Sequence, residues 1–293
     1  MSVIEVKNLR KSYDATAAVD GIDLTIVQGE IFALLGPNGA GKTTTVEILE
    51  GFRKRDSGSV SVLGMDPQAS GFEARRFRDR IGIVLQSTSD SGELTVAEVV
   101  RHFQGYYSNP READEVISAV GLAEKRNSLV RVLSGGQRRR LDVALGIIGN
   151  PELLFLDEPT TGFDPAARRA FWELVKELRN TGATIVLTTH YLDEAEALAD
   201  RVGVINRGKI IEIATPSELG GRDTSMAYVR WVIDGVSYEE RTNSPTALIQ
   251  KISADFDGEI PKLLVTRPTL EDIYLEMIGL LGADRSSSNR EVE

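Results

Sequence analysis

Residues 36–44, GPNGAGKTT, form a phosphate-binding loop of the pattern G-x-x-x-x-G-K-[ST]. Inward-pointing backbone N–H groups of such a loop solvate the phosphates of a nucleotide, and a helix N-terminus adds a partial positive charge. Lys42 places a full charge near the outer phosphates, and the hydroxyl of Thr43 is a ligand for Mg²⁺. The residues assigned to ATP binding are Gly36, Pro37, Asn38, Gly39, Ala40, Gly41, Lys42, Thr43 and Thr44.

The segments on either side of this loop are those that the pattern needs. The apolar run 31–35 predicts a buried strand, and residues 43–49 predict a helix. A chance Lys-Thr pair after a glycine-rich turn is the alternative, and it leaves these flanks unexplained. Strand, loop and helix together therefore favour a nucleotide site.

Two acids follow a second predicted strand, the apolar run 153–156. A carboxylate at the C-terminal end of a strand in an α/β sheet lies where ligands bind. Asp157 fits the acidic group that holds Mg²⁺, and Glu158, which points elsewhere, fits the base for the attacking water. A solvated turn is the alternative when the pair is considered without the phosphate loop.

A second anion-binding device is predicted at residues 134–137, SGGQ, which precede a helical run over 138–148. Ser134 can cap that helix, and the glycines Gly135 and Gly136 let a ligand approach its N-terminus. An ordinary cap with a flexible turn is the alternative. The arginines at 138–140 are interpreted as a solvated helix face.

The order of elements predicts an α/β fold with a largely parallel sheet, because strands at 31–35, 81–85, 153–156 and 184–189 alternate with helices. Strands at 2–9, 22–27 and 59–63 predict an antiparallel β layer. Capping patterns at Thr95 and Thr215 open helices, and Asp164-Pro165 opens another. Hairpins are predicted across 206–208 and across 234–235.

Composition narrows the classes of function. The 293 residues carry a net charge of −10, which disfavours non-specific binding to nucleic acid or an anionic bilayer, and no nucleic-acid partner is expected. The chain has no cysteine, which excludes disulfides and cysteine-based metal sites. No apolar run approaches the length of a membrane span, and no secretory signal is visible at the N-terminus. A cytoplasmic protein is expected.

The motif Leu133-Ser-Gly-Gly-Gln137 is identical to the signature of the ATP-binding cassette (ABC) ATPases, and the order of the other motifs resembles that family over about residues 2–220. The phosphate loop is similar to its Walker A motif, and residues 153–158 to its Walker B motif and catalytic glutamate. Residues 161–164 resemble the D-loop, with Phe163 where leucine is usual. Residues 268–274 are similar to a C-terminal motif of antibiotic- and drug-resistance exporters, or form a capped helix.

The resemblance implies roles that the residues alone do not establish. Tyr13 would stack on adenine, Gln86 would join Thr43 and Asp157 as a metal ligand, and His190 would sense the γ-phosphate beside the catalytic residues Glu158 and Lys42. Two cassettes would face each other head to tail, and one chain would contact the partner's ATP. Those contacts in trans would come from Ser134, Gly135, Gly136, Gln137 and Asp164.

The fold class implied is a P-loop NTPase of the ABC nucleotide-binding type, with a parallel-sheet core, an antiparallel β layer and a helical subdomain. We predict an ABC ATPase domain over 1–221, with the helical subdomain at about 87–148, a small α+β domain over 222–281, and a disordered tail over 282–293.

The function implied is ATP hydrolysis that powers a separate membrane permease, with ATP and Mg²⁺ as cofactors. The partners are a second ABC subunit, expected to be a copy of this chain, and the permease that holds the subunit at the inner face of the membrane. Export of drugs, antibiotics or other amphiphiles is expected, while an importer or a lipid or polysaccharide exporter stays open. The alternatives are a soluble ABC protein acting on ribosomes or DNA, and a nucleotide-binding regulator without hydrolysis.

Overall fold

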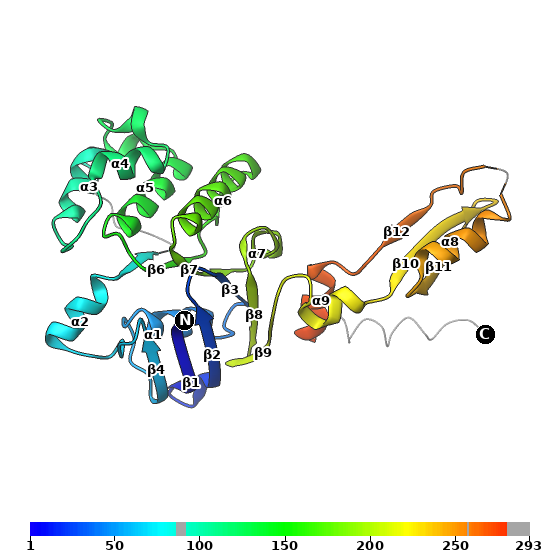
Figure 1. Ribbon diagram of the computed structural model, residues 1–293, viewed down its shortest axis with the longest axis horizontal. Helices are drawn as coiled ribbons and strands as arrows, with labels where there is room; N and C mark the ends of the chain where they lie inside the picture. The colour runs from blue at the N-terminus through cyan, green and yellow to red at the C-terminus, as the bar shows by residue number, and fades with distance from the viewer. Residues whose placement is uncertain (86–91, 257, 280–293) are drawn as a thin grey trace. The chain divides into compact units, whose positions relative to one another are not determined.

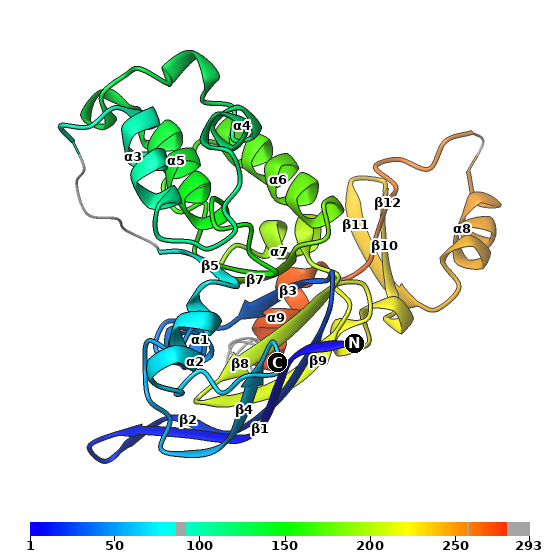
Figure 2. The same ribbon diagram turned by 60° about the vertical axis from the view of Figure 1, so that its left-hand side comes forward.

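A computed structural model describes residues 1–85, 92–256 and 258–279 (Figures 1 and 2). Internal contacts divide the chain into two units, Met1–Ile213 and Ala214–Glu293. The predicted tail at 282–293 and the predicted metal ligand Gln86 lie outside the described residues. The domain boundary at 221 stays a prediction beside this division.

The first unit is built on a six-stranded sheet with neighbouring strands in the order β5-β6-β7-β3-β8-β9. From β5 to β8 the pairs are parallel. Its strands are β3 (Ile31–Leu35), β5 (Ile81–Val84), β6 (Leu153–Asp157), β7 (Thr184–Thr189), β8 (Arg201–Asn206) and β9 (Lys209–Ala214). Every residue of β3 and β7 is buried, as parallel strands covered on both faces require, and this explains their continuous apolar or β-branched sequences.

A smaller antiparallel sheet, in the order β2-β1-β4, packs on this core. Its strands are β1 (Ser2–Tyr13), β2 (Thr16–Val27) and β4 (Ser57–Val62). Both β1 and β2 are longer than predicted, because the added residues, 10–13 and 16–21, are mostly exposed or half-buried and show no strong apolar pattern. Ile4, Ile26 and Phe155, from the two sheets, belong to one buried hydrophobic cluster. The predicted antiparallel layer on a parallel core is therefore confirmed.

Three helices of the first unit, α3, α4 and α5, pack on one another at the opposite end of this unit from β1, β2 and β4 (Figures 1 and 2). They form the predicted helical subdomain. The helices and 3₁₀ turns of the unit are α1 (Lys42–Leu49), α2 (Gly71–Arg78), α3 (Val96–Gln104), α4 (Ala113–Ala119), η1 (Ala123–Lys125), η2 (Val130–Val132), α5 (Gly135–Ile147), α6 (Pro165–Asn180) and α7 (Leu192–Leu198). Thr95 caps α3 through the predicted box with Glu98.

Two glycines bring α5 against β5. A Cβ on Gly82 of β5 would lie 2.1 Å from the carbonyl oxygen of Gly146, and a Cβ on Gly146 would lie 2.7 Å from Val84 Cγ2. Neither position has room for a side chain. The C-terminal part of α5 is therefore in direct backbone contact with the edge strand of the main sheet.

The second unit holds a three-stranded antiparallel sheet in the order β11-β10-β12. Its elements are η3 (Leu219–Thr224), β10 (Ala227–Ile233), β11 (Val236–Thr242), α8 (Pro245–Ser253), β12 (Leu264–Thr266) and α9 (Leu270–Met277). Val229 and Trp231 of β10 pack against Leu248 and Ile252 of α8. The predicted hairpin across Asp234-Gly235 and the α+β class of this segment are confirmed.

One predicted cap in this segment is wrong. Thr215 bonds Glu218 through its side chain, but it opens a turn and not a helix. The following η3 begins at Leu219 and contains Gly220 and Gly221 at positive φ, a conformation that a regular α-helix does not accept.

Candidate nucleotide-binding and catalytic site

The phosphate-binding loop leaves β3 at Leu35 and enters α1 at Lys42, as the sequence predicts. Gly41 has φ 107°, and a Cβ there would lie 2.3 Å from the carbonyl oxygen of Ala18. A Cβ on Gly36 would lie 2.4 Å from the carbonyl oxygen of Ile205. Both glycines are therefore required by close backbone approach. Residues 37–39 form a half-buried to exposed tip, and Thr43 is exposed at the start of α1.

Lys42 is buried and folds back on the loop. Its Nζ donates to the carbonyl oxygen of Gly36 at 2.7 Å and lies 3.3 Å from that of Pro37. Burial lowers the pKa of Lys42, while the charges of Glu158 and Asp157 act to raise it. The lysine of the loop and the two acids at the end of β6 therefore lie within electrostatic reach of one another.

Asp157 is the last residue of β6, beside β7. It is paired with Thr188, whose hydroxyl donates to Asp157 Oδ1 at 2.5 Å. One carboxylate oxygen is therefore held in place by the neighbouring strand. Sequence alone gives no signal for Thr188, since its contact depends on which strand lies next to β6.

Glu158 has a left-handed backbone conformation, with φ 43°. Its N–H lies 3.1 Å from both the carbonyl oxygen and the hydroxyl of Thr188. Its Oε1 is 3.4 Å from Nδ1 of His190, and its Oε2 is 3.4 Å from the hydroxyl of Thr161. The side chain of Glu158 is 17% exposed and that of His190 41%, so the pair is open to a ligand on one side.

The signature residues begin α5. The hydroxyl of Ser134 accepts from the N–H of Gln137 at 3.3 Å, and Gln137 Oε1 accepts from the N–H of Ser134 at 3.1 Å. The predicted cap is confirmed as a reciprocal box. Within the described part of the chain, a Cβ on Gly135 would meet no atom within 4 Å. The fold itself therefore leaves space in front of Gly135.

Asp164 and Tyr13 lie on other elements. Asp164 caps α6, and its Oδ1 accepts from the N–H groups of Ala166 and Ala167 at 2.9 and 2.8 Å. Tyr13, the last residue of β1, is 39% exposed, and the centroid of its ring lies 5.6 Å from Lys11 Nζ and 5.3 Å from the guanidinium of Arg53. Among the described residues no hydrogen bond joins Ser134, Gln137, Asp164 or Tyr13 to the phosphate-binding loop.

The interpretation of residues 138–140 as a solvated helix face is wrong. Arg139 is 6% exposed, and its guanidinium donates to the backbone of Leu85, Asp157 and Pro159. Arg138 and Arg140 donate to the carbonyl oxygens of Val130 and Val120. The spacing to Val143 and Gly146, four and seven residues on, is that of one helical face and could have placed Arg139 on the buried side.

Comparisons with known proteins agree with this geometry. The family description "ABC transporter" matches residues 19–161. The daunorubicin/doxorubicin resistance ATP-binding protein DrrA of Streptomyces peucetius is 37% identical over 97% of this chain and 94% of its own length. The linearmycin resistance ATP-binding protein LnrL of Bacillus subtilis is 35% identical, over 80% of this chain and 76% of that protein.

Solved structures give the same fold. The structure of cbiO1 from Clostridium perfringens, part of an ABC transporter complex, has a TM-score of 0.68 at 30% identity and covers 74% of this chain and 90% of its own. A dimeric bacterial ABC transporter cassette has a TM-score of 0.66 at 26% identity, over 72% of this chain and 98% of its own.

The fold and the site define a P-loop ATPase of the ABC cassette type. The chain belongs to the ATP-binding subunits of ABC transporters, in the group that includes the daunorubicin-resistance ATP-binding proteins. It binds and hydrolyses ATP, and cassettes of this family work as dimers with a membrane permease. These relatives do not favour the alternative of a protein acting on ribosomes or DNA. Of the helices that the structure describes, none combines the length and hydropathy of a membrane span.

Proposed function

We propose that this chain is the energising subunit of an exporter and that Glu158 is the base that activates water for ATP hydrolysis. The observation that carries the assignment is the 3.4 Å approach of Glu158 Oε1 to His190 Nδ1 at the C-terminal ends of β6 and β7, within electrostatic reach of Lys42 in α1. Ligands bind at this edge of a parallel sheet. The carboxylate of Glu158 faces His190, which in this proposal would contact the γ-phosphate and the water beside it.

The phosphate-binding loop, residues 36–44, would hold the phosphates, and Lys42 would turn from the loop carbonyls to the outer phosphates. Tyr13 would stack on the adenine, because this aromatic residue is 39% exposed at the end of β1. Ser134–Gln137 and Asp164 would contact the nucleotide of a second copy. The open space in front of Gly135, at the N-terminus of α5, supports that contact.

The residues present fit a magnesium ion. The hydroxyl of Thr43 is exposed, and the carboxylate of Asp157 is held by only one described side-chain donor, Thr188. Oxygen donors of these types are those that Mg²⁺ prefers. When bound, the ion supplies neutralisation of phosphate charge. Gln86 stays a predicted third ligand.

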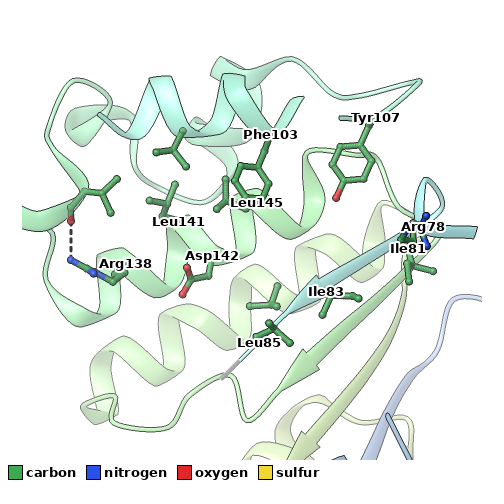
Figure 3. A pocket seen from close by; sticks show the side chains of 13 residues that line it. Arg78, Ile81, Ile83, Leu85, Phe103, Tyr107, Arg138, Leu141, Asp142 and Leu145 are labelled. Carbon is green, nitrogen blue, oxygen red and sulfur yellow. Dashed lines mark hydrogen bonds between the residues drawn. The ribbon is translucent and has the colours of Figure 1, made fainter. Parts of the chain in front are cut away.

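A groove of about 440 Å³ is the proposed contact for the permease (Figure 3). Phe103 of α3 and Leu145 of α5 point into this groove (Figure 3). They lie opposite Ile83 of β5 and Leu85, the residue that follows β5 (Figure 3). The wall is mostly apolar and Leu85 is 51% exposed, which suits a short apolar segment of a membrane partner. Docking there would place the subunit at the cytoplasmic face of the membrane, and the relatives favour a drug, an antibiotic or another amphiphile as cargo.

Glu158→Gln tests the proposal. The amide keeps the size of the side chain but cannot accept the proton of water, so we expect ATPase turnover to fall by at least about a hundredfold. ATP should still bind, and the chain should run as a dimer in size-exclusion chromatography with ATP. Wild-type turnover by this variant would show that Glu158 is not the base.

The same variant serves as bait for the partner. Tagged Glu158→Gln protein, captured with ATP from detergent-solubilised membranes of the native host, should bring down a protein with several membrane spans. Asn38→Asp, at the exposed tip of the loop, adds a negative charge beside the phosphates. We expect this variant to bind ATP poorly, and it serves as the control. Recovery of only ribosomal or DNA-associated proteins would contradict the transporter role.

A further inference from the structure

The buried side chain of Arg139 connects three parts of the site. Its Nε donates to the carbonyl oxygen of Pro159 at 2.9 Å, and one terminal nitrogen donates to that of Asp157 at 3.0 Å. The other terminal nitrogen donates to the carbonyl oxygen of Leu85, at the end of β5. Each guanidinium nitrogen thus holds a different backbone carbonyl.

Two of these carbonyls belong to the residues on either side of Glu158. A left-handed conformation of a non-glycine residue is unfavourable, and it persists where the surrounding structure determines it. At Glu158 the N–H is held by Thr188 on β7, and the flanking carbonyls are held by Arg139 on α5. The orientation of the Glu158 side chain therefore depends on both contacts.

The charge of Arg139 is accommodated without solvent. Burial lowers its pKa, and the carboxylates of Asp142, Asp157 and Glu194 act to raise it. The carboxylate of Asp142 lies 3.8 Å away, one helical turn along α5. A lysine has one nitrogen in place of three and cannot reach carbonyls that lie in three directions.

We infer that Arg139 is a positioning residue for ATP hydrolysis. It holds the backbone around Glu158 in the strained conformation that directs the carboxylate towards His190. Because Arg139 lies on α5, the helix that Ser134 caps, it also ties the signature end of α5 to the catalytic loop of the same chain. The inference rests on the proposed role of Glu158 as the base.

The test compares Arg139→Lys with Arg140→Lys. Arg140 lies on the same helix and donates one bond, of 3.0 Å, to Val120, away from the site. For Arg139→Lys we expect kcat to fall about tenfold to a hundredfold, because small displacements of catalytic groups have effects of this size. The KM for ATP should change less than about threefold, since the phosphate-binding loop is untouched. Arg140→Lys should keep wild-type kcat.

A double variant separates positioning from general damage. In a Glu158→Gln background, Arg139→Lys should not lower the residual rate further, because there is no base left to orient. An equal loss in both backgrounds, a parallel rise in KM, or wild-type kcat in Arg139→Lys would each overturn the inference.

Arg139→Gln, which keeps one donor, is the second variant. If neither folds, as judged by Trp172 fluorescence, Arg139 maintains the fold and the inference is wrong. Failure of Glu158→Gln to slow turnover would refute the proposed base instead.

Discussion

Glu50, at the end of α1, is a buried carboxyl whose ionisation the fold opposes. It is 6% exposed, and burial, together with the charges of Asp157 and Glu47, raises its pKa from 4.5 to about 8. Below pH 4.5 the folded and unfolded chains both hold the proton. Between 4.5 and about 8 only the folded chain holds it, so this group removes stability as the pH rises.

Glu50→Gln should abolish this dependence. At about 1.4 kcal/mol for each unit of pKa, the interval from 4.5 to about 8 corresponds to a ceiling of about 5 kcal/mol, and local relaxation lowers it. We expect the free energy of unfolding of Glu50→Gln, relative to wild type, to grow by about 2–4 kcal/mol from pH 5 to pH 9, because a small part of the effect is already present at pH 5. The change with pH is decisive, because burying the amide adds an offset of its own.

Urea unfolding between pH 5 and pH 9, without nucleotide or magnesium, measures the effect. The chain has two tryptophans, Trp172 in the first unit and Trp231 in the second, so a Trp231→Phe background lets Trp172 report the first unit by itself. Glu177→Gln, at an exposed position of α6, controls for the loss of a charge. A stability difference that stays flat across this range, or that grows towards acid, would refute the reasoning.

Two further changes test how the site is built. Gly41→Ala places a Cβ 2.3 Å from the carbonyl oxygen of Ala18, at a position where φ is 107°. Overpacking and backbone strain together cost about 2–5 kcal/mol, so we expect ATP binding, measured by calorimetry, to weaken at least tenfold. Gly39→Ala, at φ 79° with open space around its Cβ among the described residues, should weaken binding less, and an equal loss would contradict the steric account. Thr188→Val removes the donor to Asp157, so the Mg²⁺ concentration for half-maximal ATPase rate should rise roughly tenfold. Thr188→Ser should restore the wild-type requirement, and failure to do so would assign the effect to packing.

Continuous apolar runs and local motifs made much of the core predictable. The run at 31–35 and the loop after it specify both a strand and the start of a helix within a few residues, and the observed β3 and α1 follow that pattern. Short elements could not be predicted from such patterns. The eight residues of α2 bury only Ala74 and Phe77, which is too little to show a helical period.

Contacts between distant segments could not be read in the same way. Thr188 meets Asp157 only because β7 pairs with β6, and Arg139 lies inside because α5 packs on β5. A run of three arginines has the composition of a solvated surface. The middle arginine, Arg139, can nevertheless be buried because three backbone carbonyl oxygens accept its hydrogen bonds. The residues that position the site are thus specified by tertiary structure.

The glycine contact between α5 and β5 has a mechanical consequence. Gly146 lies near the last residue of α5, eleven positions after Gly135, the first residue of the helix. At about 1.5 Å per residue, the signature end of α5 lies about 16 Å from the glycine contact with β5. A tilt of only about 5° around the glycine pair would carry Gly135 through about 1.4 Å, roughly half the length of a hydrogen bond. A small rotation of α5 at its contact with β5 can therefore make or break a contact at the opposite, signature end of the helix.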